Sequence, residues 1–317
     1  MTSPSVRFGI SLGAFSGEVP RRDELTGLAR KAEAVGFDSV QVGDHIQWHA
    51  PILEPTTLMA TFAAVTERVR LASGVIVLPL RDPVLLAKTI ASLDVLSGGR
   101  VIFGVGVGGD HPPEYAAMRV PIGERGSRAN ESLEIIRGLW ANERFSYEGR
   151  HFTLRDVAIA PRPLQPSVPI WVGGVAEAAL RRAARYGDGW IAAFASAGKF
   201  GRLSADLRRF LGEEGRQAEG FTLGAHLFAH VDDDAARARA AAARYLERVY
   251  RLDGAQIVER FGAVGSVEAC AERALAYVET GADYIVLGPA SDHRDWPRQL
   301  DGYGEVIERV RRRAGGR

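Results

Sequence analysis

The sequence contains very little cysteine, no excess of one charge and no long apolar run. Cys270 is the one cysteine among 317 residues, which excludes an intramolecular disulfide and a cysteine-ligated zinc site. Lys and Arg number 40 and Asp and Glu number 39, so the net charge of +1 indicates neither nucleic acid nor a membrane surface as a partner. The segment Met1–Arg7 lacks the apolar core of a signal peptide, and the apolar runs are too short to cross a bilayer. We therefore expect a soluble, cytoplasmic protein.

The sequence does contain enough apolar material, 46% of its residues, for a large core. Eight short runs rich in β-branched residues predict strands, and their apolar residues are continuous rather than alternating, as in strands buried on both faces. These runs are Val6–Leu12, Ser39–Val42, Val69–Val77, Val101–Val105, Ile170–Val172, Trp190–Ala193, Thr222–Val231 and Tyr284–Leu287.

Helical patterns separate these strands. They cover Asp23–Val35, Pro83–Leu96, Arg128–Trp140, Ala176–Tyr186, Leu203–Glu214, Ala235–Tyr250, Ser266–Glu279 and Trp296–Arg312. Eight alternating β–α units favour a closed barrel over an open sheet, and barrels of this length form a single unit. We predict an α/β fold, a (β/α)8 TIM barrel, as one domain over residues 1–317. The stretch Ala141–Pro169 has several prolines and no helical period, and it is interpreted as an insertion after the fourth unit.

Polar residues follow the second predicted strand at once, as Asp44, His45 and Trp48. Ligands of α/β proteins bind at the carboxyl ends of parallel strands, so this is the first candidate site. His45 could act as a general acid or base, and Asp44 could orient it or bind a ligand. Alternatively, Asp44 caps a turn and His45 is polar surface, while Trp48 lines a pocket or packs on the barrel rim. His111 and His49 are further candidates, but their spacing does not suggest a metal site.

Three glycine-containing stretches also follow or interrupt strands. The repeat Gly104–Gly109 resembles a dinucleotide fingerprint only weakly, because the expected acid would have to end a second strand and Glu124 instead opens a helix. A crowded turn, or close approach to a flat ring, explains it as well. The stretch Ser73-Gly74-Val75 indicates a bulge, a strained peptide or a nearby ligand. The stretch Gly173-Gly174-Val175 leads into a helix, and its amides favour a phosphate over a simple tight turn.

Taken together, these stretches resemble the luciferase-like monooxygenase superfamily, the bacterial-luciferase type of TIM barrel, and within it the deazaflavin (coenzyme F420)-dependent oxidoreductases. The resemblance covers most of the chain from Phe8 to Pro289. It rests on Ala34–Val40 leading into Asp44-His45, Leu71–Pro79, Arg81-Asp82-Pro83, Ala87-Lys88, Leu93–Arg100, Gly104–Gly108, Glu124-Arg125, Pro169–Gly174, Gly187–Trp190 and Gly281–Tyr284.

The resemblance implies a flavin-like ring at the carboxyl end of the barrel. It would pack on Ser73, Gly74 and Val75, where a non-proline cis peptide is frequent, and backbone near Val107 and Gly108 would contact it. The cofactor phosphate would lie at Gly173, Gly174 and Val175. The pair Asp44-His45 with Trp48 is similar to that of deazaflavin-dependent sugar-phosphate dehydrogenases, in which the histidine serves acid–base chemistry. Members that use flavin mononucleotide (FMN) more often have Glu-His there.

The resemblance therefore implies hydride transfer between F420 and a small organic substrate, with His45 moving the proton, Asp44 contacting the cofactor, and Trp48 and His111 near the substrate. Gly109 stands where the sugar-phosphate dehydrogenases have an acid, so the substrate is open. The alternative is a two-component monooxygenase that receives reduced FMN from a separate flavin reductase and activates oxygen. A non-catalytic flavin-binding protein is a third possibility, which Asp44 and His45 disfavour. The resemblance also implies a homodimer.

Overall fold

A computed structural model describes residues 6–13, 15, 17–109 and 111–315, and its centre is a closed barrel of eight parallel strands. The barrel strands are β1 (Arg7–Ser11), β2 (Ser39–Val42), β3 (Arg70–Ser73), β5 (Val101–Gly106), β8 (Ile170–Gly173), β9 (Gly189–Ala192), β10 (Thr222–Val231) and β12 (Tyr284–Pro289). They follow one another around the barrel in chain order, and β12 pairs with both β10 and β1 to close it. The predicted TIM barrel is confirmed, with each predicted strand in its expected place.

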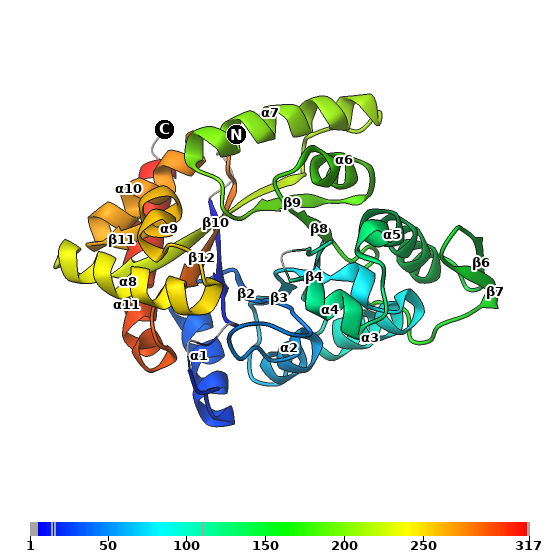
Figure 1. Cartoon of the computed structure of the whole chain (residues 1–317), viewed down its shortest axis with the longest axis horizontal. Helices are drawn as coiled ribbons and strands as arrows, with labels where there is room; N and C mark the ends of the chain where they lie inside the picture. Colours follow the sequence, from blue (N-terminus) through cyan, green and yellow to red (C-terminus); the bar gives the residue numbers. More distant parts are fainter. Residues whose placement is uncertain (1–5, 14, 16, 110, 316–317) are drawn as a thin grey trace.

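Helices surround the barrel (Figure 1). Those that follow the barrel strands are α1 (Arg22–Ala34), α2 (Pro55–Ala63), α3 (Pro83–Leu96), α5 (Arg125–Ala141), α6 (Glu177–Tyr186), α7 (Ala197–Glu213), α8 (Ala235–Tyr250), α10 (Val267–Val278) and α11 (Trp296–Gly315). Side-chain caps fix several starts: the carboxylate of Asp82 accepts from the amides of Val84 and Leu85 at the start of α3. Among the residues described, no helix is long and apolar enough to cross a membrane.

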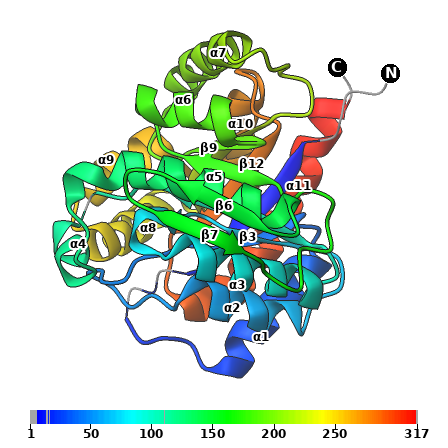
Figure 2. The same ribbon diagram turned by 90° about the vertical axis from the view of Figure 1, so that its right-hand side faces the viewer.

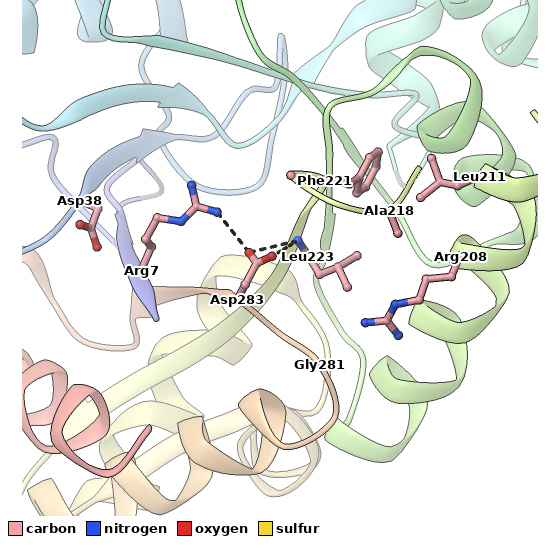
Figure 3. Close-up of a pocket in the computed structure, with 10 residues that line it drawn as sticks. Arg7, Asp38, Arg208, Leu211, Ala218, Phe221, Leu223, Gly281 and Asp283 are labelled. Atoms are coloured by element: carbon pink, nitrogen blue, oxygen red, sulfur yellow. Dashed lines mark hydrogen bonds and ion pairs between the residues drawn. The ribbon is translucent and has the colours of Figure 1, made fainter. Parts of the chain in front are cut away.

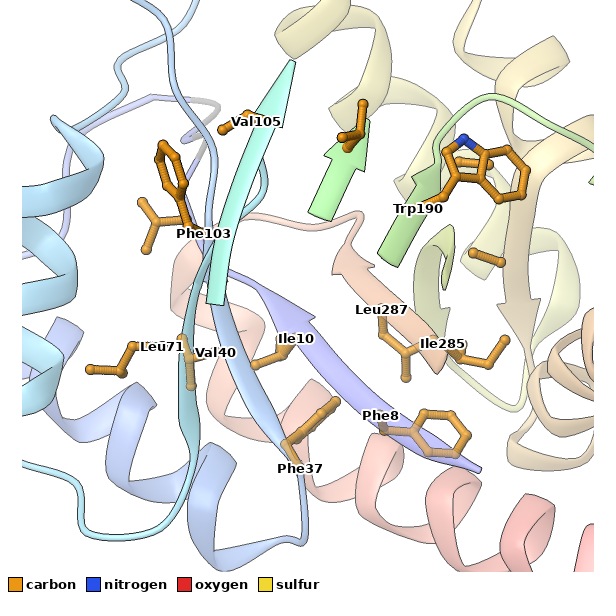
Figure 4. Close-up of a cluster of buried hydrophobic side chains, with 14 of the residues drawn as sticks. Phe8, Ile10, Phe37, Val40, Leu71, Phe103, Val105, Trp190, Ile285 and Leu287 are labelled. Carbon is orange, nitrogen blue, oxygen red and sulfur yellow. The ribbon is translucent and has the colours of Figure 1, made fainter. Parts of the chain in front are cut away.

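The core lies between the barrel and these helices (Figure 4). Alternate strand residues such as Phe8, Ile10, Val40, Phe103 and Leu287 are fully or almost fully buried there. The other residues of each strand point into the barrel, where Ala72, Ile102, Trp171, Tyr284 and Val286 form a second apolar cluster. Both faces of the strands are therefore covered, which explains why the strand sequences show no alternation between apolar and polar residues.

The insertion after α5 contains a two-stranded antiparallel hairpin, β6 (Phe145–Glu148) and β7 (Thr153–Val157). Figure 2 shows it on the outside of the molecule, against α5. The carboxylate of Glu131 on α5 accepts from the amides of Arg150, His151 and Phe152. The insertion is where the sequence indicates it, although the sequence analysis did not predict its strands.

Two smaller departures affect the carboxyl end of the barrel. The predicted strand Val69–Val77 is divided into β3 and the two-residue β4 (Ile76–Val77), with a cis peptide between Gly74 and Val75, as the family resemblance implied. A ninth parallel strand, β11 (Gly262–Gly265), pairs with the last four residues of β10 and follows the short helix α9 (Gly254–Phe261). β10 thus extends past the barrel, and α8, α9 and β11 accompany that extension.

Candidate active site

His45 follows β2 and is held by a carboxylate from another part of the chain. Its Nδ1 lies 3.3 Å from both carboxylate oxygens of Glu114, and Glu114 also accepts from the amide of Ile46 at 3.1 Å. Glu114 is fully buried on the six-residue helix α4 (Pro112–Ala117), which follows β5. Because Nδ1 is engaged, the Nε2 atom of the imidazole is the one left to exchange a proton with a substrate.

Trp48 fixes the plane of the same imidazole. The two rings stack with centroids 4.0 Å apart and an angle of 14° between their planes. The indole NH of Trp48 donates to the carbonyl of Val249 at the end of α8, at 2.9 Å, so the indole cannot rotate freely. His45 is therefore restrained at one nitrogen by a hydrogen bond and at one face by a ring, which is the restraint an acid–base residue needs.

Asp44 bonds groups other than His45. One of its oxygens accepts from the amide of Val77 at 2.9 Å, and the other accepts from the guanidinium of Arg81 at 2.7 Å. Burial raises the pKa of Asp44, and the charge of Arg81 opposes this rise. Asp44 thus ties the end of β2 to β4 and to the segment that follows β4, and the carboxylate bonded to His45 is that of Glu114. A contact between Asp44 and the cofactor stays a prediction.

His111 and His49 lie beside Trp48, as two further rings of the same group. The centroid of His111 is 5.7 Å from that of Trp48 and 5.0 Å from that of His49. The Nε2 atom of His111 is buried and has no hydrogen-bond partner among the described residues. No three His, Cys, Asp or Glu side chains of the described chain come together as metal ligands would.

Glycines at the carboxyl ends of β5 and β8 leave space that side chains would otherwise fill. The side chain of Val75 occupies part of that space. A Cβ built on Gly106 would lie 2.7 Å from a methyl carbon of Val75, and one on Gly173 would lie 3.1 Å from another. The carbonyl of Ser73 passes so close to Gly104 that no side chain fits there. Val75 therefore lies on bare backbone from β5 and β8, in an arrangement that suits a flat ring approaching from the opposite side.

Ser73 and the loop after β5 are held from within the protein. The hydroxyl of Ser73 donates to the carbonyl of Gly104 and accepts from its amide, so it joins β3 to β5. The carbonyl of Val107 accepts from the hydroxyl of Tyr115, and Gly108 has φ +57°, a left-handed conformation that glycine adopts easily. The loop Val107–Gly108 is thereby fixed with backbone at the barrel end.

The turn from β8 into α6 presents amides at a helix N-terminus. The amide of Gly174 donates to the carbonyl of Ile191 at 3.2 Å, so it belongs to the sheet. The amides of Val175 and Ala176 donate to no other described residue, and Ala176 caps α6 without a side-chain hydrogen bond. Val175 and Ala176 therefore offer free amides to an anion beside the first amides of α6, whereas Gly174 does not.

A cleft of about 740 Å3 lies at the opposite, amino end of the barrel (Figure 3). Arg7, Asp283, Arg208 and Phe221 are among the residues that line it. The guanidinium of Arg7 bonds Asp283, whose carboxylate accepts from the amide of Leu223. These groups join the starts of β1, β10 and β12, and polar groups at this end of a TIM barrel generally serve stability. None of the residues predicted for the site lines this cleft.

The barrel fold agrees with the fold of proteins to which the chain is similar. The chain matches the luciferase-like monooxygenase family over residues 6–284, and it belongs to that family. An uncharacterized protein of Mycobacterium tuberculosis is 37% identical over 209 residues, which cover 60% of this chain and 72% of that protein. An F420-dependent glucose-6-phosphate dehydrogenase of Nakamurella multipartita is 37% identical over 205 residues, covering 60% of this chain but only 57% of the dehydrogenase.

Solved structures show the same fold at lower identity. A monooxygenase from Streptomyces bottropensis superposes with a TM-score of 0.84 at 24% identity, covering 94% of this chain and 98% of that one. An F420-dependent secondary alcohol dehydrogenase, in complex with an F420–acetone adduct, superposes with a TM-score of 0.83 at 21% identity, covering 96% and 99%. The chain is therefore a luciferase-like oxidoreductase.

The sequence analysis missed Glu114 and Arg81 as parts of this site. Glu114 is the third residue of a helix that begins with Pro112 and Pro113, and proline at a first turn is a helix-start signal. That signal, directly after the glycine repeat, could have placed a carboxylate over the strand ends. Arg81 follows a three-residue 3-10 helix, Leu78–Leu80, and its pairing with Asp44 across 37 positions leaves no local pattern.

Proposed function

We propose that the protein transfers hydride between coenzyme F420 and a small organic substrate. Bound F420 supplies a two-electron hydride donor or acceptor at C5 of its ring. His45 carries the matching proton: Nε2 takes it from a hydroxyl when the substrate carbon gives up hydride, and returns it when a carbonyl carbon receives hydride. Glu114 stabilises the imidazole in its positively charged form during that exchange.

The residues that would hold the cofactor lie around His45 on neighbouring strand ends. The ring would rest on Val75, which is backed by Gly106 and Gly173, with the backbone of Val107 and Gly108 along its edge. The phosphate would accept from the amides of Val175 and Ala176 at the start of α6, where the helix dipole also favours a negative charge. A contact from Asp44 is part of the same proposal.

One observation carries the proposal: an imidazole bonded to a buried carboxylate stands at the end of β2, where the ligand sites of such barrels lie. A non-catalytic binding protein would have no need of a buried carboxylate that restrains the imidazole. The dehydrogenase relative supports F420 rather than FMN, since its name records that cofactor and it shares 37% identity with this chain.

The test is an equilibrium titration of the purified protein with F420, with FMN, and with reduced FMN under anaerobic conditions. Binding is measured by cofactor fluorescence or by calorimetry. We expect F420 to bind at least tenfold more tightly than either form of FMN. Arg208→Ala, in the cleft at the amino end, is the control and should not change the affinity. Preference for reduced FMN would instead support the two-component monooxygenase, which requires a flavin reductase as a partner.

A further inference from the structure

Aromatic side chains from four separate parts of the chain gather next to His45 at the carboxyl end of the barrel. They are Trp48 after β2, Phe194 after β9, Phe228 on β10 and Tyr250 at the end of α8, and together they are called the ring wall below. Each touches another: Phe194 lies 5.3 Å from Phe228 and 5.5 Å from Tyr250, and Tyr250 lies 6.3 Å from Trp48, measured between ring centroids. The wall is thus continuous with the imidazole that stacks on Trp48.

The ring wall is only partly covered by the protein. Phe228 is buried at 3% exposure, whereas Trp48, Phe194 and Tyr250 are partly exposed and pack against an apolar cluster behind them. Partly exposed aromatic side chains beside a polar group can form a recognition surface, because covering them with an apolar ligand removes them from water.

The backbone of Phe194 has an unusual conformation that accompanies the position of its ring in the wall. Its φ is +54°, which is rare for a bulky residue, and three aromatic contacts with Phe228, Tyr250 and Phe261 accompany that conformation. Helix α8 holds two members of the wall. The indole of Trp48 donates a hydrogen bond to the carbonyl of Val249 on α8, and Tyr250 is the last residue of that helix. The extension formed by α8, α9 and β11 therefore contributes directly to this surface.

The side chains of the wall are uncharged, which argues against a phosphorylated substrate. A phosphoryl dianion is bound by several converging cationic or NH donors. Arg251 follows Tyr250. Desolvation and then the charge of Arg251 lower the pKa of His49, whose ring lies against Trp48. The guanidinium of Arg251 could meet a polar substituent of a ligand, but the body of the ligand would meet rings.

We propose that the ring wall binds the body of the substrate, and that this body is flat and largely apolar, such as an aromatic or cyclic ketone or alcohol, rather than a sugar phosphate. The inference rests on the proposed function for the position of the reacting carbon, which would face Nε2 of His45. Offset and edge-to-face contacts with the wall would then orient the substrate between the imidazole and the cofactor ring.

The test is calorimetric binding of two probes, acetophenone and glucose 6-phosphate, to the protein with and without F420. We expect acetophenone to bind and glucose 6-phosphate not to bind. Tyr250→Ala and, as a second variant, Phe194→Ala should each weaken acetophenone binding about tenfold, because each removes a ring from the wall. Tyr147→Ala removes a half-buried tyrosine on the distant β6 strand and should leave the affinity unchanged, and melting temperatures establish that each variant is folded.

Tighter binding of glucose 6-phosphate than of acetophenone would overturn the proposal, as would acetophenone binding that neither Tyr250→Ala nor Phe194→Ala weakens. Failure of the proposed function looks different. In that case F420 does not bind, while acetophenone binding to the protein alone still depends on Tyr250 and Phe194.

Discussion

At the scale of single residues, the contact between His45 and Glu114 is the most informative in the molecule. Glu114 is fully buried and accepts from both the imidazole and the amide of Ile46. A buried carboxylate is unfavourable unless its oxygens are bonded, and here both partners lie in the segment after β2. Glu114 therefore positions that segment and restrains the imidazole.

Glu114→Gln tests this role of a positioning residue. The amide oxygen can still accept from Ile46, but it no longer stabilises a positively charged imidazole. We expect kcat to fall about tenfold, as part of the total that acid–base catalysis supplies. The dissociation constant for F420 should not change, so the loss should appear in kcat alone. A variant with altered F420 affinity and an unchanged kcat would show that Glu114 serves only structure.

His226 on β10 offers a second residue-scale prediction, on stability. Its Nδ1 is buried without a hydrogen-bond partner among the described residues, and burial lowers its pKa from 6.5 to about 4. The unfolded chain therefore binds a proton between about pH 6.5 and 4 that the folded chain does not, so stability is lost as the pH falls through this window.

The size of that loss is at most about 3 kcal/mol, from the difference between the two pKa values. His226→Leu should show a smaller loss of unfolding free energy between pH 7 and 4.5, measured by urea denaturation at several pH values. The residual slope would come from other groups, including His230, whose pKa is also lowered by burial. Equal slopes for the two proteins would mean that His226 takes up a proton in the folded chain as readily as in the unfolded chain.

At the scale of elements, the sequence predicts what has strong periodicity and misses what is short or rich in glycine. The barrel strands and helices such as α3 and α8 lie where expected, because long apolar patterns and Asp caps mark them. α7 begins at Ala197, several residues before the expected Leu203, because Gly198 and Gly201 weaken its first turns. β11 contains two glycines among its four residues, so nothing local indicates a strand.

The same limit applies to the site. Residues next to strand ends could be found because barrel topology places strand ends together, as for His45 and Trp48. Glu114 comes to His45 across 69 positions, and the ring wall joins β2, β9, β10 and α8, which only tertiary packing brings together. Likewise, the free amides at α6 depend on the register of β8 and β9, since that register assigns the amide of Gly174 to Ile191.

The N-terminus of α6 gives an element-scale prediction with a matched control. Ala176 is the exposed N-cap of this helix and lacks a capping side chain. Ala176→Asp and Ala176→Ser should each stabilise α6 by about 1 kcal/mol through capping. The Asp variant alone adds a negative charge beside the proposed phosphate, so it should weaken F420 binding about tenfold, whereas the Ser variant should not. Equal affinities in both variants would place the phosphate elsewhere.

At the scale of the whole molecule, the resemblance to luciferase-like enzymes implies a homodimer. Exposed leucines support such an interface: Leu85 and Leu96 on α3 and the nearby Leu164 are 67%, 74% and 60% exposed. Exposed apolar side chains on one face can form an association surface. We predict a dimer in sedimentation equilibrium, and at least tenfold weaker dimerisation for the double variant Leu96→Glu, Leu164→Glu with an unchanged melting temperature. A monomer at every concentration would contradict this prediction.

The two ends of the barrel hold different kinds of groups. At the amino end, ion pairs such as that of Arg7 with Asp283 join the first and last strands, and the cleft there contains no residue predicted for the site. At the carboxyl end, bare glycine backbone, a restrained imidazole and open ring faces lie together. This division is the pattern expected of TIM-barrel enzymes, and it makes the role of His45 the central claim.

The measurement that tests this claim most directly is the rate of F420 reduction or oxidation by His45→Ala with a substrate that the wild-type protein turns over, beside the affinity of the same variant for F420. We predict that kcat falls about 10²–10⁴-fold, the range for loss of a positioned acid–base group. The dissociation constant for F420 should stay within about twofold, because the ring and phosphate contacts lie on other residues. Full turnover by His45→Ala would contradict the proposal that His45 transfers the proton. His111 or water would then be the group that transfers it.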